Sequence, residues 1–391
     1  MSQQMTFHIE QDILYIELNG RIDVNNASSV EAEIQAVRRE NQGTSTVLDA
    51  DGLSYISSAG LRIILRLRKE DADLTIINVS PEVYGILEMT GFTEMMTVKK
   101  AYRRLSVDGC EMIGKGSNGA VYRYDAETIV KVYFNPDALG EIQRERELSR
   151  RALVMGINTA IPYDVVRIGD SYGTVMELLE ASSLSKLIKK DPEHLEQPLK
   201  YYVDMLKNIH RTEVTPESMP DMKQVALEWA EFDRDYLPKD MGDKLYEMVK
   251  AVPARNTMLH GDYHTNNILV RDGEALLIDM DTLCVGHPIF EFGSMFNAFI
   301  GFSEIDHDAI QNFLGISFEM GNTFWRRALG MYLETEDSAR IDEVENKAKI
   351  IGYMRLLRRT IRRSEPKREE LIEHYRDQLI KLIPAIEELT F

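Results

Sequence analysis

The stretch MLHGDYHTNNILVRDGEALLIDMDTLCVGHP, residues 258–288, restricts the folds open to this chain more than any other segment. Two apolar runs flank the turn sequence RDGE, as in a β-hairpin, and a polar loop precedes the first run. The loop carries Asp262 and Asn267, and the second run ends at Asp279. Phosphate transfer from a nucleotide requires a carboxylate near the acceptor hydroxyl and oxygen ligands for magnesium. We expect Asp262 to serve the first need, and Asn267 with Asp279 to serve the second.

A glycine-rich segment, MIGKGSNGAVYRY, places Gly114, Gly116 and Gly119 in a G-x-G-x-x-G pattern. A dinucleotide-binding loop leads into a helix, whereas strand-like residues stand on both sides of these glycines. The context favours the phosphate-covering loop of a kinase. Taken alone, the pattern fits an ordinary glycine-rich hairpin turn equally well.

A lysine in an apolar strand changes that balance. Lys131 follows the last glycine by about a dozen residues, and a charge in such a strand has little reason to be there unless it points into a site or reaches the surface. The next segment, LGEIQRERELSRRALVMGI, has helical periodicity that places Glu145 on its apolar face. We expect Glu145 to meet Lys131, and Glu141 and Glu147 to be solvated charges.

The segment YGTVMELLEASSL has the form of a strand that runs into an interlobe hinge. Backbone groups between Glu177 and Leu179 are then candidates for binding an adenine ring, although a plain core strand is the alternative. Taken together, the glycine loop, lysine, glutamate, hinge and polar loop follow the order that a kinase requires. A single His-Gly-Asp sequence would instead fit a surface loop beside a hairpin.

The spelling HGDYHTNNIL followed by LLIDMDT resembles the aminoglycoside phosphotransferase and choline kinase-like family, within the protein-kinase-like fold, over about residues 108–360. The resemblance implies a bilobal enzyme that uses ATP and Mg²⁺ and phosphorylates a hydroxyl group of a small molecule. It implies these roles: Asp262 as catalytic base, Asn267 and Asp279 as Mg²⁺ ligands, and Lys131, paired with Glu145, as the contact to the α- and β-phosphates. Protein kinases usually have Arg at the position of Gly261, and Glu291 stands where relatives often have Asp.

The first hundred residues alternate strand and helix signals and predict a small α/β domain. Within them, LDADGLSYISSAGL and VYGILEMTGF resemble the STAS domain of anti-sigma factor antagonists. That resemblance implies a signalling partner and a serine that a partner kinase phosphorylates, here Ser58. A simpler interpretation is that Ser57 or Ser58 caps the helix that begins near Ala59. Ser57 stands where an aspartate often precedes the acceptor, and Ala59 where a second serine often follows.

We therefore predict an α/β (α+β) chain with two domains: a STAS-like domain at residues 1–102, and a kinase-like fold with an N-lobe at 103–180 and a mostly helical C-lobe at 181–391. Forty-six basic against 64 acidic residues give a net charge of −18, which disfavours nucleic acid and anionic membranes as partners. Two distant cysteines and no apolar run long enough for a membrane helix predict a cytoplasmic protein.

Two questions stay open at this stage. The run RLLRRTIRRSEPKREE, residues 355–370, forms either a solvated helix face or a basic surface for an acidic partner or a phosphate. The chain as a whole is either a phosphotransferase with a regulatory domain or an anti-sigma factor antagonist-type binding protein. In the second case its kinase-like part only senses nucleotide or phosphorylates Ser58.

Overall fold

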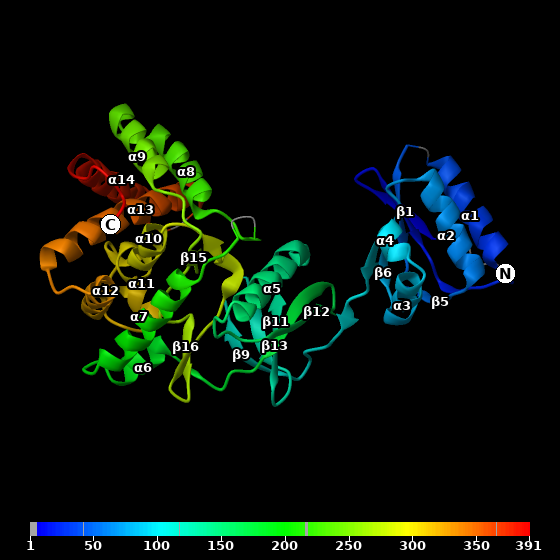
Figure 1. The fold of residues 1–391 in the computed structure, drawn as a ribbon, viewed down its shortest axis with the longest axis horizontal. Helices are drawn as coiled ribbons and strands as arrows, with labels where there is room; N and C mark the ends of the chain where they lie inside the picture. The colour runs from blue at the N-terminus through cyan, green and yellow to red at the C-terminus, as the bar shows by residue number, and fades with distance from the viewer. Residues whose placement is uncertain (1–5, 42, 117, 216–217, 365) are drawn as a thin grey trace. The chain divides into compact units, whose positions relative to one another are not determined.

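The computed structural model describes residues 6–41, 43–116, 118–215, 218–364 and 366–391. The chain divides into two compact units, Met1–Leu105 and Ser106–Phe391 (Figure 1). The division lies next to the boundary that we expected between residues 102 and 103. Among the described residues, no helix combines the length and apolar character needed to cross a membrane.

The first unit is a parallel sheet with one antiparallel edge. Its strands lie in the order β1-β2-β4-β6-β7, and only β1 and β2 are antiparallel, whereas β3 and β5 form a separate parallel pair. Alternation along β2 buries Leu14 and Ile16 completely. The elements are β1 (Phe7–Glu10), β2 (Ile13–Glu17), β3 (Gly20–Ile22), α1 (Ala27–Glu40), β4 (Ser45–Asp49), β5 (Leu53–Ile56), α2 (Ser58–Glu70), β6 (Thr75–Val79), α3 (Pro81–Met89), α4 (Phe92–Met95), β7 (Thr97–Lys100) and β8 (Arg103–Arg104).

The second unit begins with an antiparallel sheet that contains β12, β13, β11, β10 and β9 in this order. One helix, α5, packs against β12 and β13. Lys131 of β11 and Glu145 of α5 come together in this arrangement although 14 positions separate them in the sequence. The elements are β9 (Glu111–Lys115), β10 (Gly119–Arg123), β11 (Thr128–Tyr133), α5 (Leu139–Val154), β12 (Pro162–Ile168) and β13 (Ser171–Glu177).

Helices and short strands make up the remainder of the second unit. The predicted hairpin is formed by β16 and β17, and Asp272 and Gly273 both have positive φ angles, of 52° and 82°, in its two-residue turn. The elements are β14 (Ser182–Ser183), α6 (Leu184–Lys190), α7 (Glu196–Arg211), α8 (Met222–Asp233), η2 (Arg234–Tyr236), α9 (Lys239–Ala251), β15 (Met258–Leu259), β16 (Ile268–Arg271), β17 (Glu274–Leu277), η3 (Met280–Thr282), β18 (Cys284–Val285), α10 (Pro288–Phe299), η4 (Gly301–Ser303), α11 (Asp308–Leu314), α12 (Phe318–Leu333), α13 (Ser338–Arg362), α14 (Arg368–Leu382) and η5 (Ile383–Ala385).

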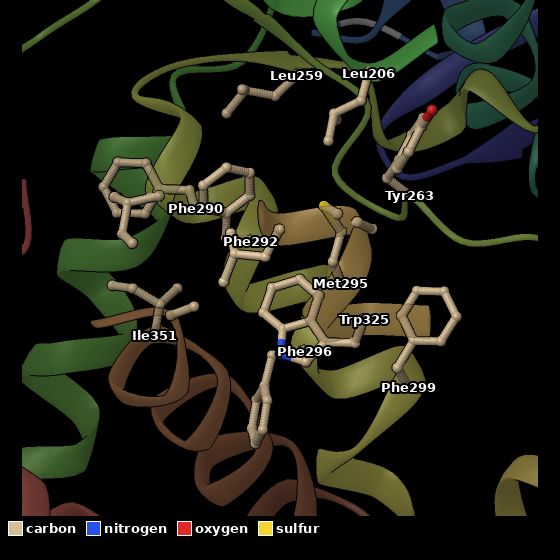
Figure 2. Close-up of a cluster of buried hydrophobic side chains, with 14 of the residues drawn as sticks. Leu206, Leu259, Tyr263, Phe290, Phe292, Met295, Phe296, Phe299, Trp325 and Ile351 are labelled. Atoms are coloured by element: carbon tan, nitrogen blue, oxygen red, sulfur yellow. The ribbon is translucent and has the colours of Figure 1, made fainter. Parts of the chain in front are cut away.

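Helix α10 is the centre of this helical region, and every one of its residues is buried. Its aromatic side chains Phe292 and Phe296 gather with Trp325 of α12 in one apolar cluster, which also includes Tyr263 of the polar loop (Figure 2). Helix α13 crosses α10 closely because glycines meet there. A Cβ on Gly293 would lie 2.4 Å from the Ile351 side chain. The predicted α/β fold class, with a small sheet domain followed by a sheet and a largely helical region, is confirmed.

Helix α2 shows how two adjacent serines divide their functions. Ser57 is the N-cap, and its Oγ accepts the N–H of Ala59 at 3.2 Å. Ser58 is the first helical residue and is exposed, and among the described residues its hydroxyl has no hydrogen-bond partner. Helix capping therefore requires Ser57 and leaves Ser58 available to solvent.

We expect Ser57→Ala to weaken the first turn of α2 by about 1 kcal/mol, because a helix N–H loses its acceptor. Ser58→Ala is the matched control and should change little. Hydrogen exchange at the Ala59 amide in the full chain measures both effects. Equal exchange in the two variants would contradict the assignment of Ser57 as the cap.

Candidate active site

A partly buried ion-pair cluster joins three segments of the second unit. Lys131 of β11 places its Nζ 2.8 Å from Glu145 Oε1 on α5 and 3.3 Å from Asp279 Oδ1, just before η3. Burial by itself lowers the pKa of Lys131, but the charges of Glu145 and Asp279 outweigh it and raise that pKa. The lysine therefore stays charged throughout the physiological pH range. Tyr133, two positions along the same strand, donates its hydroxyl to the other oxygen of Glu145 at 2.7 Å and fixes the carboxylate.

Asp262 lies on the polar loop between β15 and β16. Its Oδ2 is 3.4 Å from Nε2 of His264. Burial by itself raises the pKa of Asp262. The hydrogen bond with His264 and the positive charge of Arg355 outweigh this effect and lower the pKa to about 2. The carboxylate is therefore ionised at neutral pH, as a group that orients and accepts from a hydroxyl must be.

Backbone geometry requires the glycine before this aspartate. Gly261 has a φ of +81°, and a Cβ there would lie 2.5 Å from the carbonyl oxygen of Thr282. The Thr282 hydroxyl donates to the His260 carbonyl at 2.8 Å, which ties the loop to the end of η3. An arginine at position 261 would be excluded both by its backbone conformation and by contact.

Buried polar groups hold this loop from beneath. Glu291, fully buried on α10, accepts the N–H of His260 at 2.5 Å and that of Gly261 at 3.0 Å. The Gly261 carbonyl accepts from the hydroxyl of Ser294 at 2.9 Å and from Arg355 of α13 at 3.1 Å. Thus α10 and α13 together fix the position of Asp262.

Two neighbouring tyrosines add a further tie. Tyr263 donates its hydroxyl to the Tyr202 carbonyl at 2.6 Å, and Tyr202 donates to the Tyr263 carbonyl at 3.2 Å. Both rings are fully buried, so the reciprocal bonds anchor the loop to α7 inside the core.

Asn267 and Asp279 present oxygen atoms of the kind that Mg²⁺ prefers. The Nδ2 of Asn267 donates to the Asp262 carbonyl at 3.0 Å, which leaves its Oδ1 as the atom for a cation. Asp279 is half exposed and sits at a φ of +63°. Within the described residues no group of three or more His, Cys, Asp or Glu forms a metal cluster. One carboxylate and one amide oxygen suit an ion that takes its other ligands from water and phosphates.

The glycine-rich segment is a hairpin between β9 and β10. Gly114 lies in β9 opposite Val121, and the Gly116 N–H donates to the Gly119 carbonyl at 2.9 Å. Gly119 itself is tightly enclosed, since a Cβ there would lie 2.4 Å from the carbonyl oxygen of Val132. The strand β10 of this hairpin pairs with β11, which carries Lys131.

The hinge borders an open groove of about 600 Å³. Leu179 lines this groove, together with Ile113 of β9 and the turn of the β16–β17 hairpin. The amide of Glu177 donates to Ile161 and that of Leu178 to Glu127, whereas the Leu179 amide has no acceptor among the described residues. Of the two hinge residues that we selected, only Leu179 lines the groove.

A second cavity of about 480 Å³ lies beside the ion pair and is lined by residues that include Glu145 and Asp281. Asp281 is partly exposed, yet the surrounding protein and the charges of Asp279 and Glu145 raise its pKa to about 7. We did not select this residue from the sequence. The spacing Asp-x-Asp at positions 279 and 281 is the signal that would have identified it.

The sequence analysis also missed Arg355, Ser294 and Ile113. In the sequence, Arg355 belongs to a run of arginines and nothing distinguishes it from the others. Ser294 lies in an apolar segment that gives no sign of a polar role. Ile113 is 42% exposed although it is large and apolar. Its position next to the glycines is the sequence signal that would have identified it as a residue of the groove. Ser58 belongs to the first unit and is described there by itself.

Comparison with known proteins gives matches in both units. Residues 110–323 match the family described as phosphotransferase enzyme family, and residues 4–105 match the STAS domain. A protein of Bordetella bronchiseptica named as an anti-sigma factor antagonist, BtrV, is 35% identical over 85 residues, which cover 21% of this chain and 72% of that protein.

Solved structures similar to this chain include aminoglycoside phosphotransferases. An apo thermostable mutant of APH(4)-Ia is 12% identical and covers 71% of this chain and 94% of its own, with a TM-score of 0.48. ADP-bound APH(2'')-Ib is 17% identical and covers 78% of this chain and 99% of its own, with a TM-score of 0.47.

We expect Gly261→Ala to destabilise the second unit more than Gly273→Ala does. Both glycines have φ near +80°, so both variants acquire backbone strain of about 1–2 kcal/mol. Only at position 261 would the new Cβ collide with backbone, whereas at 273 the nearest atom is 3.9 Å away. Chemical denaturation of the full chain should show the difference, and equal losses would mean that the loop can move away from Thr282.

Proposed function

This chain belongs to the phosphotransferase enzyme family through residues 110–323 and carries a STAS domain at residues 4–105, and we propose that it transfers the γ-phosphate of ATP to a hydroxyl group of a small molecule. Both family resemblances expected from the sequence are confirmed by these matches. The finer assignments below, which concern nucleotide, metal, acceptor and individual residues, are our proposal.

The observation that supports the proposal best is the ion pair of Lys131 with Glu145 and Asp279. A lysine held between two carboxylates beside a glycine hairpin is placed to bind the phosphates of a nucleotide. In a purely structural salt bridge, the second carboxylate, that of Asp279, would have no reason to keep nearly half of its side chain exposed.

Each proposed step uses groups described above. The adenine ring would lie in the hinge groove, against Ile113 and within reach of the free Leu179 amide, with the phosphates under Gly114, Gly116 and Gly119. Asn267 and Asp279 would hold Mg²⁺, which when bound neutralises phosphate charge. Asp262 would orient the acceptor hydroxyl and accept its proton as the new P–O bond forms and the bond to the β-phosphate breaks.

We expect Asp262→Asn to lower kcat for phosphate transfer by about 10²- to 10⁴-fold, because the amide cannot accept the proton. Nucleotide affinity should change little, since Asp262 does not contact Lys131. The matched control is Asp170→Asn, an exposed carboxylate in the turn between β12 and β13. ADP release and product mass are measured with Mg-ATP and a panel of hydroxylated metabolites.

The proposal fails if the parent protein binds no nucleotide or if Asp262→Asn transfers phosphate as fast as the parent. ATP binding without transfer to any acceptor, with intact-mass analysis unchanged, would favour the alternative in which the second unit only senses nucleotide.

We further propose that the STAS domain binds a signalling protein and that Ser58 is its phosphate acceptor. The supporting observation is the exposed Ser58 hydroxyl at the start of α2, which is spared from capping by Ser57. Free N–H groups and the helix dipole at this position favour a phosphate. The relative from Bordetella bronchiseptica, named as an anti-sigma factor antagonist, covers this region.

We expect phosphopeptide mapping of protein from its native cells to place a phosphate on Ser58, and Ser58→Ala to remove it. Ser54→Ala, an exposed serine on the preceding strand, should leave it in place. If Asp262→Asn keeps the phosphate, an outside kinase adds it. If Asp262→Asn loses the phosphate, and purified parent protein gains it with Mg-ATP, the chain modifies itself. Absence of phosphate on Ser58 in every preparation would contradict the proposal.

A further inference from the structure

We propose that the acceptor is an anionic metabolite, whose phosphate or carboxylate group binds to Arg358 and Arg362 of α13 while its hydroxyl group lies at Asp262. This inference deepens the proposed function and rests on it for the position of the hydroxyl group. It concerns the arginine run at residues 355–363, which the sequence left either as a solvated face or as a basic surface.

The run begins at the active site. Arg355 donates to the Gly261 carbonyl at 3.1 Å and to the Ser294 hydroxyl at 2.9 Å, and its charge lowers the pKa of Asp262. The first arginine therefore lies against the loop that carries the proposed catalytic base. Because Arg355 makes these contacts, the run is not solvated along its whole length.

The run then continues away from Asp262 along one face of α13. Arg355, Arg358 and Arg362 have the spacing i, i+3 and i+7, which places them in a row on one side of a helix. From the first to the last the helix rises about 10 Å. This length fits a small metabolite with its hydroxyl at one end and its charge at the other.

Helix α8 packs against α13 (Figure 1), and two of its aromatic rings lie beside the row. The Arg355 guanidinium lies 5.7 Å from the ring centroid of Trp229, and that of Arg358 lies 5.9 Å from Phe232. The rings, one helical turn apart, hold the planar guanidinium groups without neutralising them. Such groups are suited to bidentate contacts with phosphate or carboxylate.

Acids lie near the row, but none of them forms a close ion pair with Arg355 or Arg358 among the described residues. Within the described parts of the chain, neither Arg355 nor Arg358 has a carboxylate oxygen within 4.0 Å. Asp233 of α8 is 0% exposed, neither of its oxygens has a hydrogen-bond partner among the described residues, and burial raises its pKa well above the usual value. The charge of Arg358 opposes that shift, and Asp233 in turn raises the pKa of Arg358. Glu228, also on α8, is exposed and acts on Arg358 only at longer range.

Desolvation and the charge of Arg362 both lower the pKa of Arg358, so the two arginines repel each other. A protein with a net charge of −18 keeps five arginines and no acid in residues 355–363. An anion bound between Arg358 and Arg362 relieves this repulsion, whereas a cationic acceptor would increase it.

The test measures binding and transfer separately in the full chain. Isothermal titration without nucleotide uses ribose 5-phosphate and gluconate as phosphate and carboxylate probes, with ribose as the neutral control and kanamycin as the cationic one. The variants are Arg358→Gln and Arg362→Gln. The matched control is Arg340→Gln, a partly exposed arginine near the opposite end of α13 that pairs with Glu343.

We expect at least one anionic probe to bind, and its Kd to rise about tenfold in Arg358→Gln and in Arg362→Gln, which corresponds to about 1.4 kcal/mol each. Arg340→Gln should match the parent. Because Arg362 is exposed, its substitution leaves the fold intact even if Arg358→Gln unfolds. The inference is overturned if neither anion binds, if ribose or kanamycin binds as tightly, or if both variants bind like the parent.

Transfer assays with Mg-ATP keep the two proposals apart. Anion binding that depends on Arg358 without any product in the parent would overturn the phosphotransferase assignment and leave the anion site standing. Phosphorylation of a neutral acceptor at rates unaffected by both variants would support the phosphotransferase and overturn the anion site.

Discussion

The arrangement of the second unit depends on one ammonium group. Lys131 contributes a positive charge to a place where β11, α5 and the segment before η3 meet, and two carboxylates from these segments surround it. A largely buried charge without partners would be unfavourable, and the two carboxylates offset this cost where the three segments meet. The same convergence leaves Asp279 with one face toward solvent. The charge that stabilises the fold thus also creates a site that an anionic nucleotide and its cation can complete.

The loop that carries Asp262 obeys a second constraint, which is that buried polar groups must be satisfied. Glu291 accepts two consecutive backbone N–H groups, and α13 returns through Arg355 to satisfy the Gly261 carbonyl. These bonds hold the loop in place from beneath. The Asp262 carboxylate, which we propose as the catalytic base, lies in an environment that keeps it ionised.

The two units place different chemistry in one chain. The phosphotransferase region would use Asp262 and its cation ligands, whereas the STAS domain offers Ser58 at a helix start where a phosphate is favoured. The arginine row on α13 gives the catalytic region a basic surface within an acidic protein. The proposed recognition of an anionic acceptor and the proposed regulation through Ser58 would be separate properties, since each would use residues of one unit.

The sequence by itself determined the fold class, both family resemblances, and the order of the glycine loop, Lys131, Glu145 and Asp262, because local periodicity and motif spacing record these features directly. It could not separate Arg355 from the other arginines of its run, nor show that Leu179 lines the hinge groove while Glu177 does not. Those distinctions depend on how α13 crosses α10 at Gly293 and on which backbone amides are already paired. Contacts between residues nearly a hundred positions apart leave no periodic trace in a single sequence. Only the tertiary structure, which brings these distant residues into contact, decides them.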